Sequence, residues 1–272
     1  MTRLEERGET RIFAARLSAD WAIWGPNGGY LAALALRAGG ACAAIPRPVS
    51  FYCHFLSVAR FEPVELRVKP LRLGRRSEAW EVSMWQDERP VLHAMLRTAA
   101  EAPGLEHDVA QMPAVPAPDE LLTWSELFPD EPSTYAFWNN LEAKPTDGKL
   151  LPKADAEQQA LPPTLGQWNR FRPRACFDDP FVDAGRSVIL VDTMFWPAAA
   201  RAHPQPAFQA PSLDLSVWFH RPAHTHEWLL SDHSAPIGAA GVIGGTGRVW
   251  SVDGRLIASG GAQLLCIPAV YP

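Results

Sequence analysis

Apolar and polar residues alternate along two long parts of the chain, as they do in half-exposed antiparallel β-strands. The segment Glu65-Leu66-Arg67-Val68-Lys69 and residues 78–84 both have this period of two. Pro, Gly or charged residues separate such segments from one another. In the first half the pattern predicts strands at residues 11–17, 49–56, 64–71, 77–86 and 91–98.

Between the first two of these strands, the pattern of apolar residues changes. Residues 30–36 follow Asn27-Gly28-Gly29, carry no charge before Arg37, and end in a second glycine pair, Gly39-Gly40. Good helix formers bounded by glycines predict one helix. Because its apolar residues face all directions, we expect it to be buried on nearly every side.

The second half repeats the order of strand, helix and four strands. The predicted helix covers residues 187–202, with Asp192 near its start as an N-terminal charge favoured by the helix dipole. Pro197 predicts a kink, or a start one turn later. The predicted strands are residues 167–172, 213–219, 227–231, 241–251 and 256–266.

These similarities extend to the sequence itself. Residues 50–56 and 62–66 correspond to residues 214–220 and 226–230, and the turn at 87–92 corresponds to 253–258, always roughly 165 positions apart. We interpret the chain as two diverged copies of one β-rich unit. At the start of the repeated segment, one copy has Ser50 where the other has Asp214.

Residues 101–163 break the pattern and contain ten of the 26 prolines. We expect a connecting segment with a short helix at residues 123–127, packed on the domains through its aromatic side chains. The predicted organisation is an N-terminal domain at 1–100, a Pro-rich linker at 101–163 and a C-terminal domain at 164–272.

Composition limits the classes of function. With 47% hydrophobic and 20% charged residues, the 272-residue chain is predicted to be globular, and its net charge of −5 argues against nucleic acid as a partner. The charged N-terminus lacks the apolar stretch of a secretory signal, and no run of about 18 apolar residues predicts a membrane span. We expect a cytoplasmic protein whose four scattered cysteines are reduced.

The second half also carries a recognisable motif. Ser212-Leu213-Asp214-Leu215-Ser216-Val217-Trp218-Phe219-His220-Arg221-Pro222 is followed by Glu227-Trp228-Leu229-Leu230 and Asp253-Gly254-Arg255-Leu256-Ile257-Ala258-Ser259. In the order and spacing of these segments, the chain resembles the acyl-CoA thioesterase II family. The resemblance implies an α+β fold called a double hot-dog, in which two antiparallel sheets each wrap around one long apolar helix.

Asp214 is the principal catalytic candidate. It lies among Leu213, Leu215 and Val217 on a predicted strand, where an unpaired carboxylate is costly to bury. The resemblance implies a general base that activates water for attack on a thioester carbonyl. The alternative is an exposed acid at the end of the strand, paired with Arg221 or another cation.

The family's acid acts with a hydroxyl residue and a glutamine, for which the resemblance implies Ser234 and Gln263. Without gaps, however, Ala235 or Pro236 falls at the hydroxyl position and Ala262 at the glutamine position. A β-bulge at Gly260-Gly261 is predicted if Gln263 is to reach the site. Otherwise both candidates are hydrogen-bonded surface residues.

The start of the first helix is the candidate oxyanion site. The backbone N–H groups of Gly28, Gly29 and Tyr30 point outward there, and the helix N-terminus favours negative charge. In hot-dog thioesterases this helix end lies near the acid of the other unit. Alternatively, the glycines only allow close packing of helix and sheet.

Other clusters are given structural interpretations. His220, His224, His226 and His233 lack the spacing of a metal site, so no metal is predicted. A basic hairpin is expected to be a solvated tip, although it offers cations for the phosphates of coenzyme A; its residues are Lys69, Arg72, Arg75 and Arg76.

The motif and the family resemblance therefore predict an acyl-CoA thioesterase that hydrolyses fatty or related acyl-CoA to free acid and CoA, without metal or bound cofactor. A homo-oligomer is compatible with this prediction. Two alternatives stay open. One is an acyl-binding hot-dog protein with weakened or no catalysis, which the displaced Gln263 favours. The other is a hydratase of the enoyl-CoA type, whose Asp-x-x-x-x-His spacing is missing from the motif region.

Overall fold

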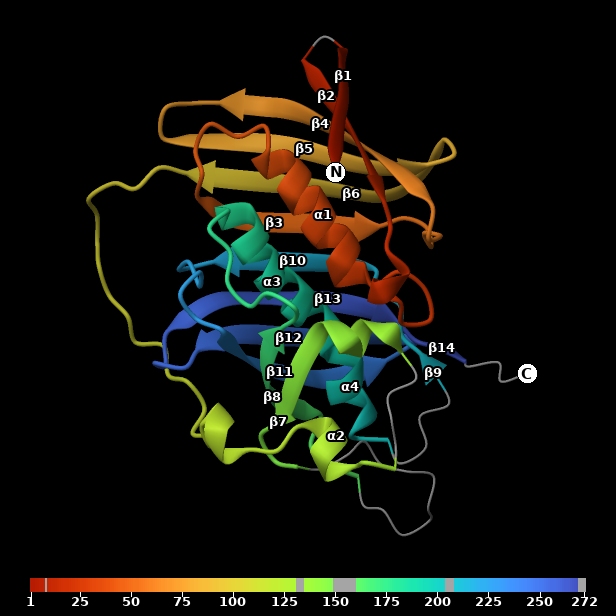
Figure 1. The fold of residues 1–272 in the computed structure, drawn as a ribbon, viewed down its shortest axis with the longest axis vertical. Helices are drawn as coiled ribbons and strands as arrows, with labels where there is room; N and C mark the ends of the chain where they lie inside the picture. Colours follow the sequence, from red (N-terminus) through yellow and green to blue (C-terminus); the bar gives the residue numbers. More distant parts are fainter. Residues whose placement is uncertain (8, 131–134, 149–159, 204–207, 269–272) are drawn as a thin grey trace.

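The computed structural model describes all residues except 8, 131–134, 149–159, 204–207 and 269–272. Its main feature is one twelve-stranded antiparallel sheet in the order β1-β2-β4-β5-β6-β3-β10-β13-β12-β11-β8-β7. Helices α1 and α3 lie side by side across one face of this sheet (Figure 1). The sequence predicts about ten strands in one sheet; the additional two are β1 and β7, one at each edge.

The first half forms seven regular elements, and the five strands expected from alternation are all present. Their bounds are β1 Thr2–Arg7, β2 Thr10–Arg16, α1 Gly28–Gly40, β3 Pro48–Phe55, β4 Pro63–Leu73, β5 Ser77–Gln86 and β6 Arg89–Ala99. A short 3-10 helix, Ala19–Trp21, precedes α1.

The described part of the segment between the halves contains more regular structure than its proline content predicts. The expected short helix is present as α2, Trp124–Leu127. Strand β7, Leu141–Pro145, was not predicted and extends the sheet beyond β8. Two 3-10 helices, Pro118–Glu120 and Ala136–Asn140, complete the described part of this segment.

The second half begins at β8 and contains the remaining elements. Their bounds are β8 Thr164–Phe171, α3 Pro180–Thr193, α4 Phe195–Ala200, β9 Phe208–Gln209, β10 Asp214–Phe219, β11 Trp228–Ala239, β12 Val242–Ser251, β13 Leu256–Leu265 and β14 Ile267–Pro268. Strands β9 and β14 form a separate two-stranded sheet.

Both halves have the same strand order, as the repeated sequence predicts. The first half reads β2-β4-β5-β6-β3 and the second, in the opposite direction, β8-β11-β12-β13-β10. They join where β3 pairs with β10. In this pair Asp214 is opposite His54 and Trp218 is opposite Ser50, which is the register expected if Asp214 and Ser50 are equivalent positions.

The second helix differs from its prediction. Helix α3 starts at Pro180, not at residue 187, and ends at Thr193, where a new helix, α4, takes over. Asp179 caps α3 by accepting hydrogen bonds from the N–H groups of Phe181 and Val182, and proline is favoured at the first helical position. The break replaces the kink expected at Pro197, which lies in the first turn of α4.

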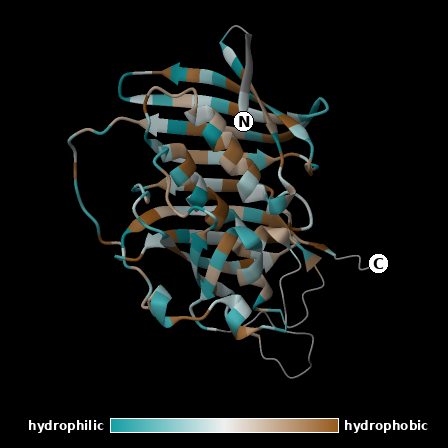
Figure 2. Ribbon diagram, in the orientation of Figure 1, coloured by the Kyte–Doolittle hydropathy of each residue, from teal (hydrophilic) through white to brown (hydrophobic). Residues whose placement is uncertain are grey.

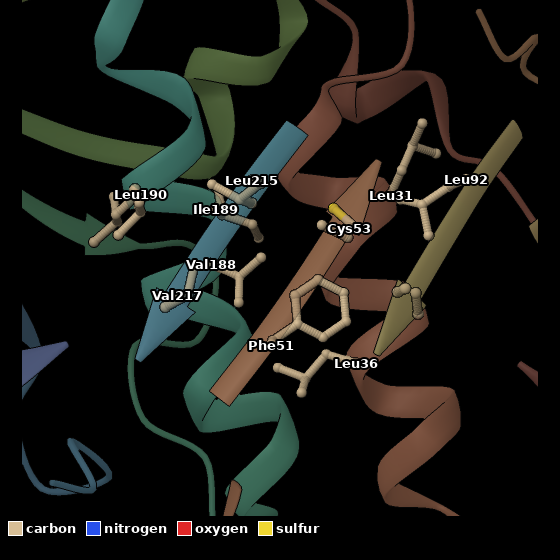
Figure 3. Close-up of a cluster of buried hydrophobic side chains, with 14 of the residues drawn as sticks. Leu31, Leu36, Phe51, Cys53, Leu92, Val188, Ile189, Leu190, Leu215 and Val217 are labelled. Atoms are coloured by element: carbon tan, nitrogen blue, oxygen red, sulfur yellow. The ribbon is translucent and has the colours of Figure 1, made fainter. Parts of the chain in front are cut away.

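Apolar side chains from both helices and from the strands beneath them form one continuous core. Figure 3 shows Leu215 and Val217 of β10 beside Val188 and Ile189 of α3. Along the sheet, hydrophobic and hydrophilic residues alternate, so one face is available for the helices (Figure 2). Helix α1 is mostly buried, as expected for residues 30–36, although Leu34 is half-buried; the exposed Arg37 lies beyond this uncharged segment. Among the described residues, no helix has the length and apolar character needed to cross a membrane.

Candidate active site

The first turn of α1 lies at the junction between the two halves. Asn27 caps the helix, because its side-chain oxygen accepts a hydrogen bond from the N–H of Tyr30 at 2.9 Å. The Asn27 side-chain amide donates to Thr193, in the last turn of α3, at 3.3 Å. The start of one helix therefore meets the end of the other.

Asp192 lies at this meeting point, at the C-terminal end of α3. The sequence pattern predicts a position near a helix start, which is wrong because α3 begins at Pro180, twelve residues before Asp192. One carboxylate oxygen accepts a hydrogen bond from the N–H of Gly29 at 2.6 Å, and the other accepts one from the Ser212 hydroxyl at 2.9 Å. The carboxylate thus joins α1, α3 and the segment before β10.

The surroundings of Asp192 disfavour its charge. The residue is only 6% exposed, and burial raises its pKa from 3.8 to about 6, although the hydrogen bonds from Ser212 and Gly29 favour the ionised form. A carboxyl group with this pKa changes its protonation near neutral pH, which is a property of many functional acids.

The two glycines at the start of α1 make room for this carboxylate. A methyl group on Gly28 would lie 2.9 Å from a carboxylate oxygen of Asp192 and 3.2 Å from the ring of Phe55. A methyl group on Gly29 would lie 2.8 Å from the Cα atom of Ile189. The close approach of α1 and α3 therefore requires glycine at these positions, whereas the structural alternative for the glycine pair was close packing of helix and sheet.

The three predicted oxyanion donors differ in whether their N–H groups already have a hydrogen-bond acceptor. The N–H of Tyr30 is bonded to Asn27, and the N–H of Gly29 is bonded to Asp192. Within the described parts of the chain, the N–H of Gly28 has no acceptor. Only Gly28 is thus free to donate a backbone hydrogen bond to a ligand in this structure.

Asp214 is half-buried at the start of β10, and its carboxylate accepts a hydrogen bond from the backbone N–H of Gln263 at 3.1 Å. Burial raises the pKa of the Cys53 thiol well above its ordinary value, and the charges of Asp192 and Asp214 raise it further. The two carboxylates are therefore near one buried thiol at the junction.

A strand irregularity does occur beside Asp214, but not where the sequence analysis predicts it. Three residues of β10 and its approach lie between the pairs Ser216–Gly261 and Ser212–Leu264, whereas β13 has only two. The extra residue is therefore near Asp214. Strand β13 passes through Gly260-Gly261 without a shift in its register with β12, so the predicted bulge is wrong.

The side chain of Gln263 remains on the exposed side of the sheet as a result. It follows the buried Ala262 and precedes the buried Leu264, so regular alternation directs it away from the helices. Its backbone, not its side chain, contacts Asp214.

Ser234 is half-buried in β11, opposite Thr246 of β12. Strands β13 and β12 separate β11 from β10, which places Ser234 and Asp214 three strand spacings, or roughly 14 Å, apart. The structure does not bring Ser234 and Asp214 together. Ser212, which was not a predicted site residue, places a hydroxyl group at the junction, hydrogen-bonded to Asp192.

The remaining clusters lie outside this junction or have partners within the core. His233 is buried beneath α3 and contacts the carbonyl oxygen of Val191 at 3.1 Å, and burial lowers its pKa to about 4. In the described portion of the chain, no group of three or more His, Cys, Asp and Glu side chains is placed to hold a metal ion. The basic hairpin between β4 and β5 is exposed, at the C-terminal end of α1, where Glu78 accepts from the N–H of Ala44 at 3.1 Å.

Comparisons with known proteins agree with the duplicated architecture. The acyl-CoA thioesterase N-terminal domain family matches residues 17–99, and the acyl-CoA thioesterase C-terminal domain family matches residues 107–267. Acyl-coenzyme A thioesterase 8 from Homo sapiens is 26% identical over 228 residues, which cover 76% of this chain and 69% of that protein.

Solved structures show the same fold. A hot-dog protein of unknown function from Alicyclobacillus acidocaldarius is 23% identical, with a TM-score of 0.80 over 98% of this chain and 96% of that one. Acyl-CoA thioesterase II TesB2 from Mycobacterium marinum is 21% identical, with a TM-score of 0.76 over 99% and 97%. With both family matches in chain order and the hot-dog fold in both halves, this chain belongs to the acyl-CoA thioesterase family, a family of thioester hydrolases.

Proposed function

We propose that the protein hydrolyses fatty or related acyl-CoA thioesters at the junction between α1 and β10, to give free acid and CoA. The observation that carries this proposal is the open N–H of Gly28 at the start of α1, in the same junction as the half-buried Asp214. A donor for a developing oxyanion and a proton acceptor for water are the two groups that thioester hydrolysis requires.

In the proposed mechanism, Asp214 takes a proton from a water molecule while the water oxygen attacks the thioester carbonyl carbon. The N–H of Gly28 and the dipole of α1 stabilise the negative charge on the carbonyl oxygen. The carbon–sulfur bond then breaks, and the CoA sulfur receives the proton from Asp214. The backbone N–H of Gln263 holds the carboxylate. We assign no chemical step to the side chains of Gln263 and Ser234.

Apolar surface beside the junction supports an acyl substrate. Trp24, Leu56 and Val58 are each about half exposed or more. Leu56 follows Phe55, whose ring lies beside Gly28, and Val58 lies beside Gly25 before the helix. An acyl chain bound on these side chains would have its thioester carbonyl near the N–H of Gly28.

Acyl-CoA binding without turnover is the second candidate function. It is favoured by Ala262 and by Ala235 or Pro236, which occupy the positions where the family pattern has a glutamine and a hydroxyl residue. Both candidate functions use the same junction, and they differ only in whether thiol is released.

The two functions are separated by measuring steady release of free thiol from short, medium and long acyl-CoAs. Asp214→Asn keeps the size of the side chain but removes the proton acceptor, so turnover should fall by roughly 10²-fold or more. Asp178→Asn, at an exposed aspartate, is the matched control and should keep the parental rate. Parental turnover in Asp214→Asn would refute Asp214 as the base. Binding of acyl-CoA with no thiol release by the parent protein would favour the binding function.

A further inference from the structure

We infer that Asp192 is a positioning residue for this hydrolysis: it fixes the first turn of α1 so that the N–H of Gly28 faces the thioester carbonyl. The inference rests on the proposed function and extends it to a residue outside the thioesterase motif. Asp192 itself is too enclosed to contact a substrate, at 6% exposure, so it acts through Gly28 and Gly29.

The carboxylate of Asp192 connects α3 to two other segments of the chain. Its two oxygens accept hydrogen bonds from the N–H of Gly29 in α1 and from the hydroxyl of Ser212, two residues before Asp214. A single buried group therefore sets the position of the proposed oxyanion donor relative to the proposed base. A displacement of about 1 Å between such groups lowers rates strongly.

Of the three amides at the start of α1, two already have hydrogen-bond acceptors. Asn27 and Asp192 occupy the N–H groups of Tyr30 and Gly29, and only the N–H of Gly28 remains without an acceptor among the described residues. Because the neighbouring amides are fixed, the peptide of Gly28 cannot rotate freely. It is thus held in a single orientation before substrate binds.

Asp192 also lacks the ion pair with a cation that usually compensates a buried charge. In the same helix, Asp183 is also buried, but it forms an ion pair with Arg186. No ion pair to Asp192 occurs in the described part of the protein. An unpaired buried carboxylate is unfavourable for folding, so its presence at the junction indicates a role in function.

The test compares Asp192→Ala with Asp192→Asn. Asparagine retains an oxygen that accepts the N–H of Gly29, whereas alanine does not. We expect Asp192→Ala to lower kcat about tenfold to a hundredfold with KM changed less than about threefold, and Asp192→Asn to keep kcat within about threefold of the parent. Phe181→Leu, at the opposite end of the helix pair, is the packing control and should leave kcat unchanged.

Amide hydrogen exchange at Gly29 gives a readout that does not depend on activity. Exchange should be slow in the parent protein and in Asp192→Asn, and at least tenfold faster in Asp192→Ala. Equal exchange in all three proteins would overturn the inference, as would parental kcat in folded Asp192→Ala. If Asp192→Asn loses as much kcat as Asp192→Ala, the charge is essential and positioning is refuted. If the parent releases no thiol but the exchange pattern holds, it is the proposed hydrolysis that fails.

Discussion

The two ends of the α1–α3 helix pair have the same backbone arrangement but opposite chemistry. With the starts of the two helices aligned, Gly29 corresponds to Phe181 and Gly40 to Asp192. At one end the carboxylate of Asp192 contacts Gly29; at the other the ring of Phe181 lies over Gly40. Both contacts need a glycine opposite a larger side chain, so the same close packing holds an acidic side chain at one end and an aromatic side chain at the other.

This difference shows how a duplicated fold can specialise one of two equivalent places. The apolar end buries a phenyl ring and is favourable for folding. The acidic end buries a carboxylate without a cation, and it is the end that faces Asp214 and the open N–H of Gly28. The β3–β10 strand pair shows the same kind of difference, because Asp214 in β10 and Ser50 in β3 occupy equivalent positions and only one of them is an acid.

The largest expected effect is a pH dependence of stability that originates at the acidic end. The pKa of Asp192 is about 6 in the folded protein against an ordinary value of 3.8. The folded state therefore binds this proton more tightly than the unfolded state does. The contribution of Asp192 to stability is therefore fully present below pH 3.8 and is lost as pH rises through about 6, by about 3 kcal/mol for this shift.

Urea unfolding of the parent and of Asp192→Asn between pH 4 and 8 measures this effect. The variant should gain relative to the parent by up to about 3 kcal/mol as pH rises. Asp192 and Asp214 both act on the thiol of Cys53, so the comparison is made in the Asp214→Asn background; burial keeps the Cys53 thiol neutral in this range. Phe181→Leu should differ from the parent by a constant amount. A constant difference for Asp192→Asn as well would contradict the raised pKa.

The next largest expected effect is the loss of stability when Gly29 or Gly40 is replaced by alanine. Alanine is the better helix former, yet Gly29→Ala and Gly40→Ala should each destabilise by about 1–3 kcal/mol because the added methyl group has no space. At Gly40 the obstacle is the ring of Phe181, so Phe181→Leu should recover part of the loss. At Gly29 the obstacle is the backbone of Ile189, and no side-chain truncation can remove it.

Double-mutant cycles in denaturant test this contrast. Favourable coupling between Gly40→Ala and Phe181→Leu, with none between Gly29→Ala and Ile189→Val, is the expected result. Thiol release should fall in Gly29→Ala and stay unchanged in Gly40→Ala. Equal losses of activity at both glycines would remove the distinction between the two ends.

The sequence predicted most of the fold because alternation and repetition are local signals. Most predicted strands match the structure within about three residues, but β11 continues to Ala239, eight residues beyond its predicted end. The Ser50–Asp214 equivalence appears in the register between β3 and β10. The start of α3 was missed because Asp183 and Arg186 interrupt its apolar pattern. These two charges have the i,i+3 spacing of a helical ion pair and pair with each other inside the core; their burial, and not their spacing, is what the local pattern does not reveal. Asp179-Pro180 was the available signal for the helix start.

The candidate site was less predictable for a physical reason. Asp192 becomes a site residue only through contacts with Gly29 and Ser212, and the first of these is distant along the chain. The side of the sheet on which Gln263 lies depends on which strand carries the extra residue. The glycine pair suggested β13, but the extra residue lies near Asp214 in the approach to β10. Register and helix ends, which decide contacts between elements, depend on packing more than on local sequence.

The smallest expected effect concerns the caps of the two helices. Asn27 caps α1 and Asp179 caps α3, so replacing either with alanine should destabilise the protein by about 1 kcal/mol. Asn27 also donates a hydrogen bond to the other helix, at the hydroxyl of Thr193. A cycle of Asn27→Ala and Thr193→Val should therefore show coupling of about 0.5 kcal/mol or more, whereas Asp179→Ala and Thr193→Val should be additive. Additivity in both cycles would mean that the acidic end is held by Asp192 alone, and it would assign the position of the first turn of α1 to that carboxylate without help from the cap.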